Sequence, residues 1–150
     1  MSQFTTPLMV MPLADGTWKL LEQFQFYTRD ADYIITVPAG FETDFGSIPR
    51  PLWMLWPPYH PSYGKAAVIH DYLYTKQAHE TGYPFTRRWA DQQFLEGMRV
   101  LGANWLRRGI LFGMVRLWGW IPWRWHTQRL QQEAVRKTVA DLLEKKRVKK

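Results

Sequence analysis

The sequence contains no cysteine, so neither disulfide bonds nor thiolate ligands can stabilise the fold or bind a metal. Any metal must then be held by oxygen atoms or imidazole, and a reducing cytoplasm or a particle assembled there is the expected setting. Long hydrophobic runs are missing too: the most apolar window, residues 110–121, contains Arg116 and is shorter than the roughly 20 apolar residues of a membrane span. The first 16 residues have no basic region followed by a long apolar core, so we expect neither a signal peptide nor a transmembrane helix.

Acidic residues are scarce in the last third of the chain. Residues 105–150 carry 12 basic and 3 acidic residues, a net charge of +9, whereas residues 1–104 carry 8 basic and 10 acidic residues, a net charge of −2. A basic segment attracts anions in general: nucleic acid, lipid headgroups or an acidic protein surface. No recognised nucleic-acid-binding motif accompanies this one.

Tryptophan is concentrated in the same third, where five of the nine Trp residues lie, at positions 105, 118, 120, 123 and 125. Trp interleaved with Arg over residues 105–130 suits a helix at a lipid or protein interface, so we expect contact with a membrane surface or with another protein. In the alternative, the Trp side chains face the core and the Arg stems cover them.

The order of patterns predicts an α+β fold in one domain: a small N-terminal antiparallel β-sheet followed by a bundle of about four helices. Residues 1–45 are β-rich, with a hairpin from 17–28 and 32–38, and an earlier strand near 7–12 that pairs through the Asp15-Gly16 turn. Residues 46–63 form a proline-rich loop, with one helical turn at 51–56. Residues 64–150 are helical with a basic C-terminal tail; we expect helices at 65–77, 86–100 after a Thr86 cap, 105–118, and from Pro122 onward.

One group of side chains could carry chemistry. His70 and Tyr74 are four residues apart and therefore share a helix face, and Asp71 lies about 100° round from His70. Asp91 on the next helix comes beside His70 if the two helices are antiparallel. An imidazole is the natural base near neutral pH, and charges in such an apolar run need compensation. In the structural alternative, Asp91 caps a helix, pairs with Arg87 or Arg88, or accepts a hydrogen bond from Tyr74.

Three motifs resemble a known family. They are VPAGFETDFGSIPR at residues 37–50, YGKAAVIHDYLY at 63–74 and ADQQF at 90–94. In this order they resemble the phage and prophage family called domain of unknown function 1353, over about residues 5–120. The resemblance implies a phage origin, with the host cytoplasm or the virion as location, and it implies no reaction.

A second resemblance is local. His-Asp-x-x-Tyr on one helix and Asp-x-x-Phe on the next, within residues 66–98, are similar to the two-helix core of phospholipases A2, especially bacterial ones. This similarity implies that His70 is the base that activates water, that Asp71 binds calcium, and that Asp91 and Tyr74 orient the base. The half-cystines of that family are absent here.

The glycine-rich calcium loop of the phospholipases is not evident either. Because calcium accepts about six to eight oxygens from flexible loops, Asp44, together with Ser47, is a candidate replacement ligand. The alternative is that Asp44 forms an Asx turn or caps the turn over residues 49–56. The order His60, His70-Asp71, Asp91 is also similar to metal-dependent phosphohydrolases, although the step from His60 to His70 is short.

We therefore expect a hydrolase-like site, with calcium-dependent hydrolysis of lipids or esters as the leading hypothesis. A non-catalytic virion, tail or assembly component, or an inhibitor of a host protein, is the alternative, in which the cluster is a buried structural network. A catalytic cluster should open to a cavity, whereas a structural one should be sealed and fully hydrogen-bonded.

Overall fold

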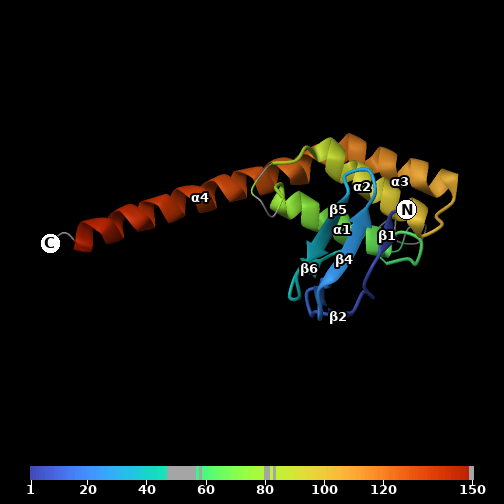
Figure 1. Ribbon diagram of the computed structural model, residues 1–150, viewed down its shortest axis with the longest axis horizontal. Helices are drawn as coiled ribbons and strands as arrows, with labels where there is room; N and C mark the ends of the chain where they lie inside the picture. Colours follow the sequence, from blue (N-terminus) through green and yellow to red (C-terminus); the bar gives the residue numbers. More distant parts are fainter. Residues whose placement is uncertain (47–56, 58, 80–81, 83, 149–150) are drawn as a thin grey trace.

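The computed structural model describes residues 1–46, 57, 59–79, 82 and 84–148. Within these residues, strands come first and helices follow. The strands are β1 (Gln3–Phe4), β2 (Val10–Pro12), β3 (Trp18–Leu20), β4 (Phe24–Thr28), β5 (Tyr33–Val37) and β6 (Glu42–Thr43); the helices are α1 (Gly64–Lys76), α2 (Arg87–Val100), α3 (Trp105–Trp118) and α4 (Trp120–Val148). The strands pair antiparallel. The predicted α+β class is confirmed (Figure 1).

The strands form two small sheets, ordered β1-β4-β5 and β2-β3-β6. The predicted β4–β5 hairpin and the β2–β3 pairing around Asp15-Gly16 are both present. The prediction of one strand over residues 17–28 is wrong, because the chain bends between Leu20 and Phe24 and passes from one sheet to the other. Leu20 and Phe24 are both buried, and a continuous strand would turn Glu22 to the same side. The bend keeps Glu22 exposed.

Helices α1 and α2 pack against each other and cover one face of the β1-β4-β5 sheet, which lies beside them in Figure 1. Phe26 of β4 and Ile35 of β5 point into the core between sheet and helices. The two helices approach closely at Gly97, where an added Cβ would lie 2.8 Å from the Cβ of Ala66. This close approach brings the predicted site residues of the two helices together.

Local signals place the helix ends close to the predicted positions. Thr86 caps α2, since its hydroxyl accepts a 3.1 Å hydrogen bond from the backbone N–H of Trp89. Asn104 caps α3 in the same way, and Pro122 lies in the first turn of α4, where its missing N–H is tolerated. The helical turn predicted at 51–56 and the candidate ligand Ser47 lie outside the described residues.

Only the beginning of α4 packs with the other helices. The side chain of Gln77, just after α1, donates a 2.7 Å hydrogen bond to the backbone carbonyl of Trp123 and accepts one of 2.7 Å from the hydroxyl of Thr127. Residues 131–147 are all exposed, and α4 extends away from the rest of the molecule (Figure 1). Among the described helices, none is both long enough and apolar enough to cross a membrane.

Candidate functional site

His70, Tyr74 and Asp91 meet where α1 packs on α2. The His70 Nε2 atom lies 3.0 Å from Oδ1 of Asp91, and the Tyr74 hydroxyl donates a 2.6 Å hydrogen bond to the same oxygen. The spacing of four residues on α1 puts the imidazole and the phenol over one carboxylate. The structure thus brings together the three residues for which the sequence predicts catalytic roles.

Aromatic rings fix the orientation of the His70 imidazole. The ring centroids of Tyr74 and Phe94 lie 4.1 Å and 5.1 Å from that of His70. The His70 side chain is 8% exposed and Asp91 is fully buried. With Nε2 donating to the Asp91 carboxylate, a neutral imidazole carries its lone pair on Nδ1. That atom has no hydrogen-bond partner among the described residues.

Arg116 of α3 completes the network around Asp91. Its Nη1 donates a 2.6 Å hydrogen bond to Oδ2 of Asp91, and Nη1 of Arg87 lies 3.6 Å from the same atom. Arg87 also donates to the backbone carbonyls of Val115 and Arg116. The pairing of Asp91 with Arg87 and the hydrogen bond from Tyr74, both foreseen in the structural alternative, are therefore present together with the hydrogen bond to His70.

The charge of Asp91 follows from these contacts. Burial by itself raises the pKa of a carboxyl group, but the hydrogen bonds from His70, Tyr74 and Arg116 together outweigh burial and hold the pKa of Asp91 below its ordinary value. Burial and the hydrogen bond to Asp91 raise the pKa of the Tyr74 hydroxyl. Near neutral pH the cluster therefore holds an ionised Asp91 and a neutral phenol.

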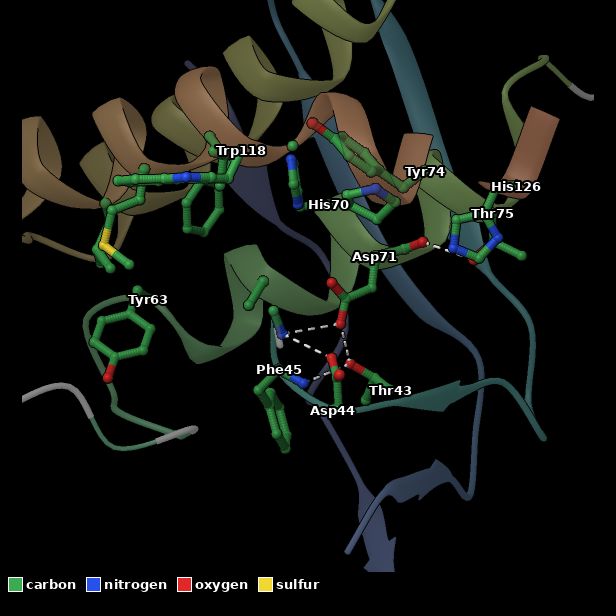
Figure 2. A pocket seen from close by; sticks show the side chains of 18 of the residues that line it. Thr43, Asp44, Phe45, Tyr63, His70, Asp71, Tyr74, Thr75, Trp118 and His126 are labelled. Carbon is green, nitrogen blue, oxygen red and sulfur yellow. Dashed lines mark hydrogen bonds between the residues drawn. The ribbon is translucent and has the colours of Figure 1, made fainter. Parts of the chain in front are cut away.

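The Asp71 side chain does not point toward Asp91. It points toward β6 and the loop that follows it. Its Oδ2 accepts a 2.5 Å hydrogen bond from the Thr43 hydroxyl and a 3.2 Å hydrogen bond from the backbone N–H of Gly46. The Gly46 N–H also lies 3.1 Å from Oδ1 of Asp44, which is the Asx turn of the alternative interpretation. Phe45 and Gly46 have positive φ angles of 58° and 96°, which curl the loop toward α1. Two carboxylates thus share one amide (Figure 2).

These two carboxylates fit part of a calcium site. Burial, followed by the nearby charge of Asp44, raises the pKa of Asp71 to about 8, and the Thr43 and Gly46 hydrogen bonds only partly oppose the increase. A bound cation would favour the charged forms of both side chains. Among the described residues, however, no three His, Asp or Glu side chains lie in a metal-binding arrangement. Asp71 and Asp44 are the residues that would hold calcium, and the other oxygens it needs are not supplied by acidic side chains of the described part.

A cavity of about 530 Å³ opens in front of this group. His70, Asp71, Thr43 and Asp44 line one side of it, and Figure 2 shows these side chains around the hollow. Most of the wall is apolar and comes from the β6 loop, α1, α2, α3 and the start of α4: Phe41, Phe45, Tyr63, Ala67, Phe94, Leu111, Met114, Val115, Trp118, Ile121 and Pro122. Asp91 is not among the lining residues, so one of the three predicted acidic groups lies behind the cavity wall.

Several contributing residues were not predicted. The signal for Arg116 in the sequence is its position inside the most apolar window, because an unpaired charge there would be unfavourable. The contribution of Thr43 was not predicted, because no sequence signal indicates that β6 lies beside α1. The His60 ring contacts Ser62 at 2.8 Å and Arg107 at 3.2 Å, and among the described residues it forms no metal-binding group with His70, Asp71 and Asp91 of the kind that the similarity to phosphohydrolases implies.

The Trp residues of the last third divide between the core and the surface. Trp123 packs edge-on against Tyr74 at 5.1 Å, as the core-facing alternative expects. The other four are exposed by 77%, 59%, 48% and 67%: Trp105, Trp118, Trp120 and Trp125. Trp118 also lines the cavity, so an exposed indole lies at its mouth.

Comparison with known proteins identifies one family. The sequence profile described as "Protein of unknown function (DUF1353)" matches residues 18–115, which extend from β3 to near the end of α3. Neither a curated protein sequence nor a solved structure matched the chain. The match includes every residue of the cluster except Arg116, which follows its last position, and it covers well over half of the sequence. The chain therefore belongs to the DUF1353 family of proteins of unknown function.

Proposed function

We propose that this protein is a phage-encoded hydrolase that cleaves esters of lipids or similar acyl compounds, with His70 as the base. The observation that carries the proposal is the position of the imidazole. Its Nε2 is held by buried Asp91, while the ring lines a cavity with mostly apolar walls. The phage origin rests on the three family motifs, and with it the host cytoplasm or the virion as the place of action.

The chemistry assigned to His70 is general base catalysis. Nδ1 accepts a proton from a water molecule as the oxygen of that water attacks the ester carbonyl carbon. When the tetrahedral intermediate collapses, the same nitrogen returns the proton to the departing alkoxide, so that ester and water become acid and alcohol. Ionised Asp91 stabilises the imidazolium that forms between these two steps. Tyr74 and Phe94 keep the ring in place.

The cavity favours a substrate with an acyl chain. Aromatic and aliphatic side chains cover most of its wall, and polar groups are gathered on the side of His70 and Asp71. Lipid contact through residues 105–130 is part of the proposal, because exposed Trp118 lies at the cavity mouth and Trp120 and Trp125 are exposed nearby along the chain. Calcium is also part of it: bound at Asp71 and Asp44, the cation would polarise the ester carbonyl.

The test compares the wild-type protein with His70→Ala on phosphatidylglycerol vesicles and on soluble aryl esters, with and without calcium. We expect the variant to lose roughly 10²- to 10⁴-fold in turnover, the usual contribution of a positioned base. Tyr74→Phe keeps the ring and loses only the hydrogen bond to Asp91, so a smaller loss is expected. Equal turnover by wild type and His70→Ala would contradict the proposal.

The second candidate is a non-catalytic role in the virion, the tail or assembly, or as an inhibitor of a host protein. It is favoured by the sealed environment of Asp91, whose two oxygens contact His70, Tyr74 and Arg116 without any exposure to solvent. Under this candidate the wild-type protein hydrolyses none of the esters at any calcium concentration, and His70→Ala lowers the melting temperature without any other effect.

A further inference from the structure

The far half of α4 packs against no other element among the described residues. Its side chains are exposed from residue 131 to residue 147, a stretch of roughly 25 Å at 1.5 Å per residue. The hydrogen bonds that tie α4 to the rest of the molecule end at Thr127. A helix of this length is marginal in water on its own propensity and normally gains its stability from packing of one face.

This segment has an apolar face. Val135, Val139 and Leu142 follow one another at steps of four and three residues, with Leu143 beside them, and they are 49–62% exposed. We call these four side chains the apolar stripe. A step of four followed by a step of three is the heptad spacing of a coiled coil. It puts Val139 at core position a and Val135 and Leu142 at core position d, and Val at a with Leu at d favours two-stranded pairing. Figure 1 shows this part of α4 clear of the other elements.

Basic residues lie on and beside the stripe, with Lys146 in line with it, whereas acidic residues lie away from it. At 100° per residue, the acidic residues Glu133, Asp141 and Glu144 lie roughly 135–155° from its centre, on the opposite side of the helix. Arg136 and Lys145 flank it on its two sides. These flanking positions select the partner in a coiled coil, because they face charges on the neighbouring helix.

We propose that residues 131–147 dock an acidic amphipathic helix of another protein in a two-stranded coiled coil. In a parallel pair with a second copy of this chain, Arg136 would face Gln131, and the three acidic residues of the segment lie away from the flanking positions, so self-pairing gains no ion pair. The segment also contains no aromatic residue, although interfacial membrane helices commonly carry Trp or Phe on the apolar face. The partner that complements this surface therefore carries Glu or Asp beside its own apolar seam.

The probe for this surface is a synthetic four-heptad peptide with Val and Leu at the core positions and Glu at every flanking position. Its matched control carries Lys at the flanking positions. Copies of the same peptide repel one another at low salt because their flanking charges have the same sign, so each peptide stays available to pair with the protein. Titration calorimetry with the full-length protein should show binding of the Glu peptide, weakening as salt is added, and no binding of the Lys peptide.

Three variants test whether the Glu peptide binds at the apolar stripe and its flanking positions. Val139→Asp should weaken Glu-peptide binding at least about tenfold, because it buries an unpaired carboxylate in the seam. The double variant Arg136→Glu with Lys145→Glu should weaken it roughly fivefold or more and create binding of the Lys peptide. Lys137→Glu, which reverses a single charge on the far side of the helix, should leave the affinity unchanged.

Three results would overturn the proposal. The first is equal binding of the two peptides, or of neither. The second is a concentration-dependent dimer of the protein alone, seen by sedimentation and abolished by Val139→Asp, which would assign the stripe to a second copy. The third is binding to phosphatidylglycerol vesicles that Val139→Asp removes, without binding of the Glu peptide, which would assign it to a membrane.

Discussion

Arg116 of α3 and Arg136 of α4 have opposite environments. The guanidinium of Arg116 points inward and donates to fully buried Asp91, whereas Arg136 lies in a segment where every side chain is exposed. The difference shows that the last third of the chain, basic and amphipathic throughout, serves two purposes. Its first part closes the cavity and neutralises the buried carboxylate. Its second part presents charge and apolar side chains to the solvent.

The family match divides the chain at nearly the same place. It ends at residue 115, so the exposed segment 131–147 lies beyond it, while the cluster on α1 and α2 lies within it. The site region is held by buried contacts between segments distant in sequence, such as those between Asp71 and Thr43. Among the described residues, the contacts of the projecting segment lie within its own helix, such as the hydrogen bond that the Thr138 hydroxyl donates to the backbone carbonyl of Ala134. Substitutions should therefore affect the two regions very differently.

The largest contrast should come from removing one acidic side chain in each region. Asp91→Ala leaves buried His70 and Tyr74 without their hydrogen-bond acceptor and half-buried Arg116 without its counterion, and we expect it to lower the free energy of unfolding by about 3 kcal/mol or more. Asp141→Ala on the exposed helix should change that free energy by no more than about 0.5 kcal/mol. Denaturant titration of both variants measures the difference, and comparable losses would remove the distinction between the two regions.

A smaller contrast should appear with pH. Burial and the charge of Asp44 raise the pKa of Asp71 to about 8, so between pH 4 and pH 8 the folded protein binds more protons at this site than the unfolded chain does. This group therefore destabilises the fold progressively as pH rises through that window. Asp71→Asn, which mimics the protonated form, should match the wild type at pH 4 and melt a few degrees higher at pH 8.5.

Exposed Asp141→Asn is the control, because it should follow the wild-type melting curve at each pH. If calcium binds at Asp71 and Asp44, its addition at pH 8.5 should raise the melting temperature of the wild type and leave Asp71→Asn unchanged. Parallel curves for wild type and Asp71→Asn across the whole pH range would show that the carboxyl group of Asp71 has its ordinary pKa.

Local signals in the sequence were enough to predict the helices. Thr86 caps α2, Pro122 starts α4, and the apolar period of α1 carries His70 and Tyr74 on one face, so the pairing of His70 with Asp91 followed from two antiparallel helices. The division of residues 17–28 between two sheets was not predictable from strand propensity. It depends on keeping Glu22 out of the core, which becomes evident only when both neighbouring strands are placed.

The rest of the site depends on contacts between distant segments. Thr43 reaches Asp71 across 28 residues, and Arg116 reaches Asp91 across 25. No period or propensity encodes such pairs. Arg116 illustrates the difficulty: its sequence context of Trp, Leu and Arg suits a surface helix, yet its head group is a counterion of the buried Asp91. Only the packing of α3 on α2 distinguishes these two roles.

The central claim is that Asp91 holds His70 with its Nδ1 free to act as a base. Long-range ¹H–¹⁵N NMR correlation of the His70 ring, recorded near neutral pH, tests this claim most directly. The account predicts a proton on Nε2, hydrogen-bonded to Asp91, and an unprotonated Nδ1. A proton on Nδ1 would contradict it, because the nitrogen assigned to the base would then have no lone pair to accept a proton.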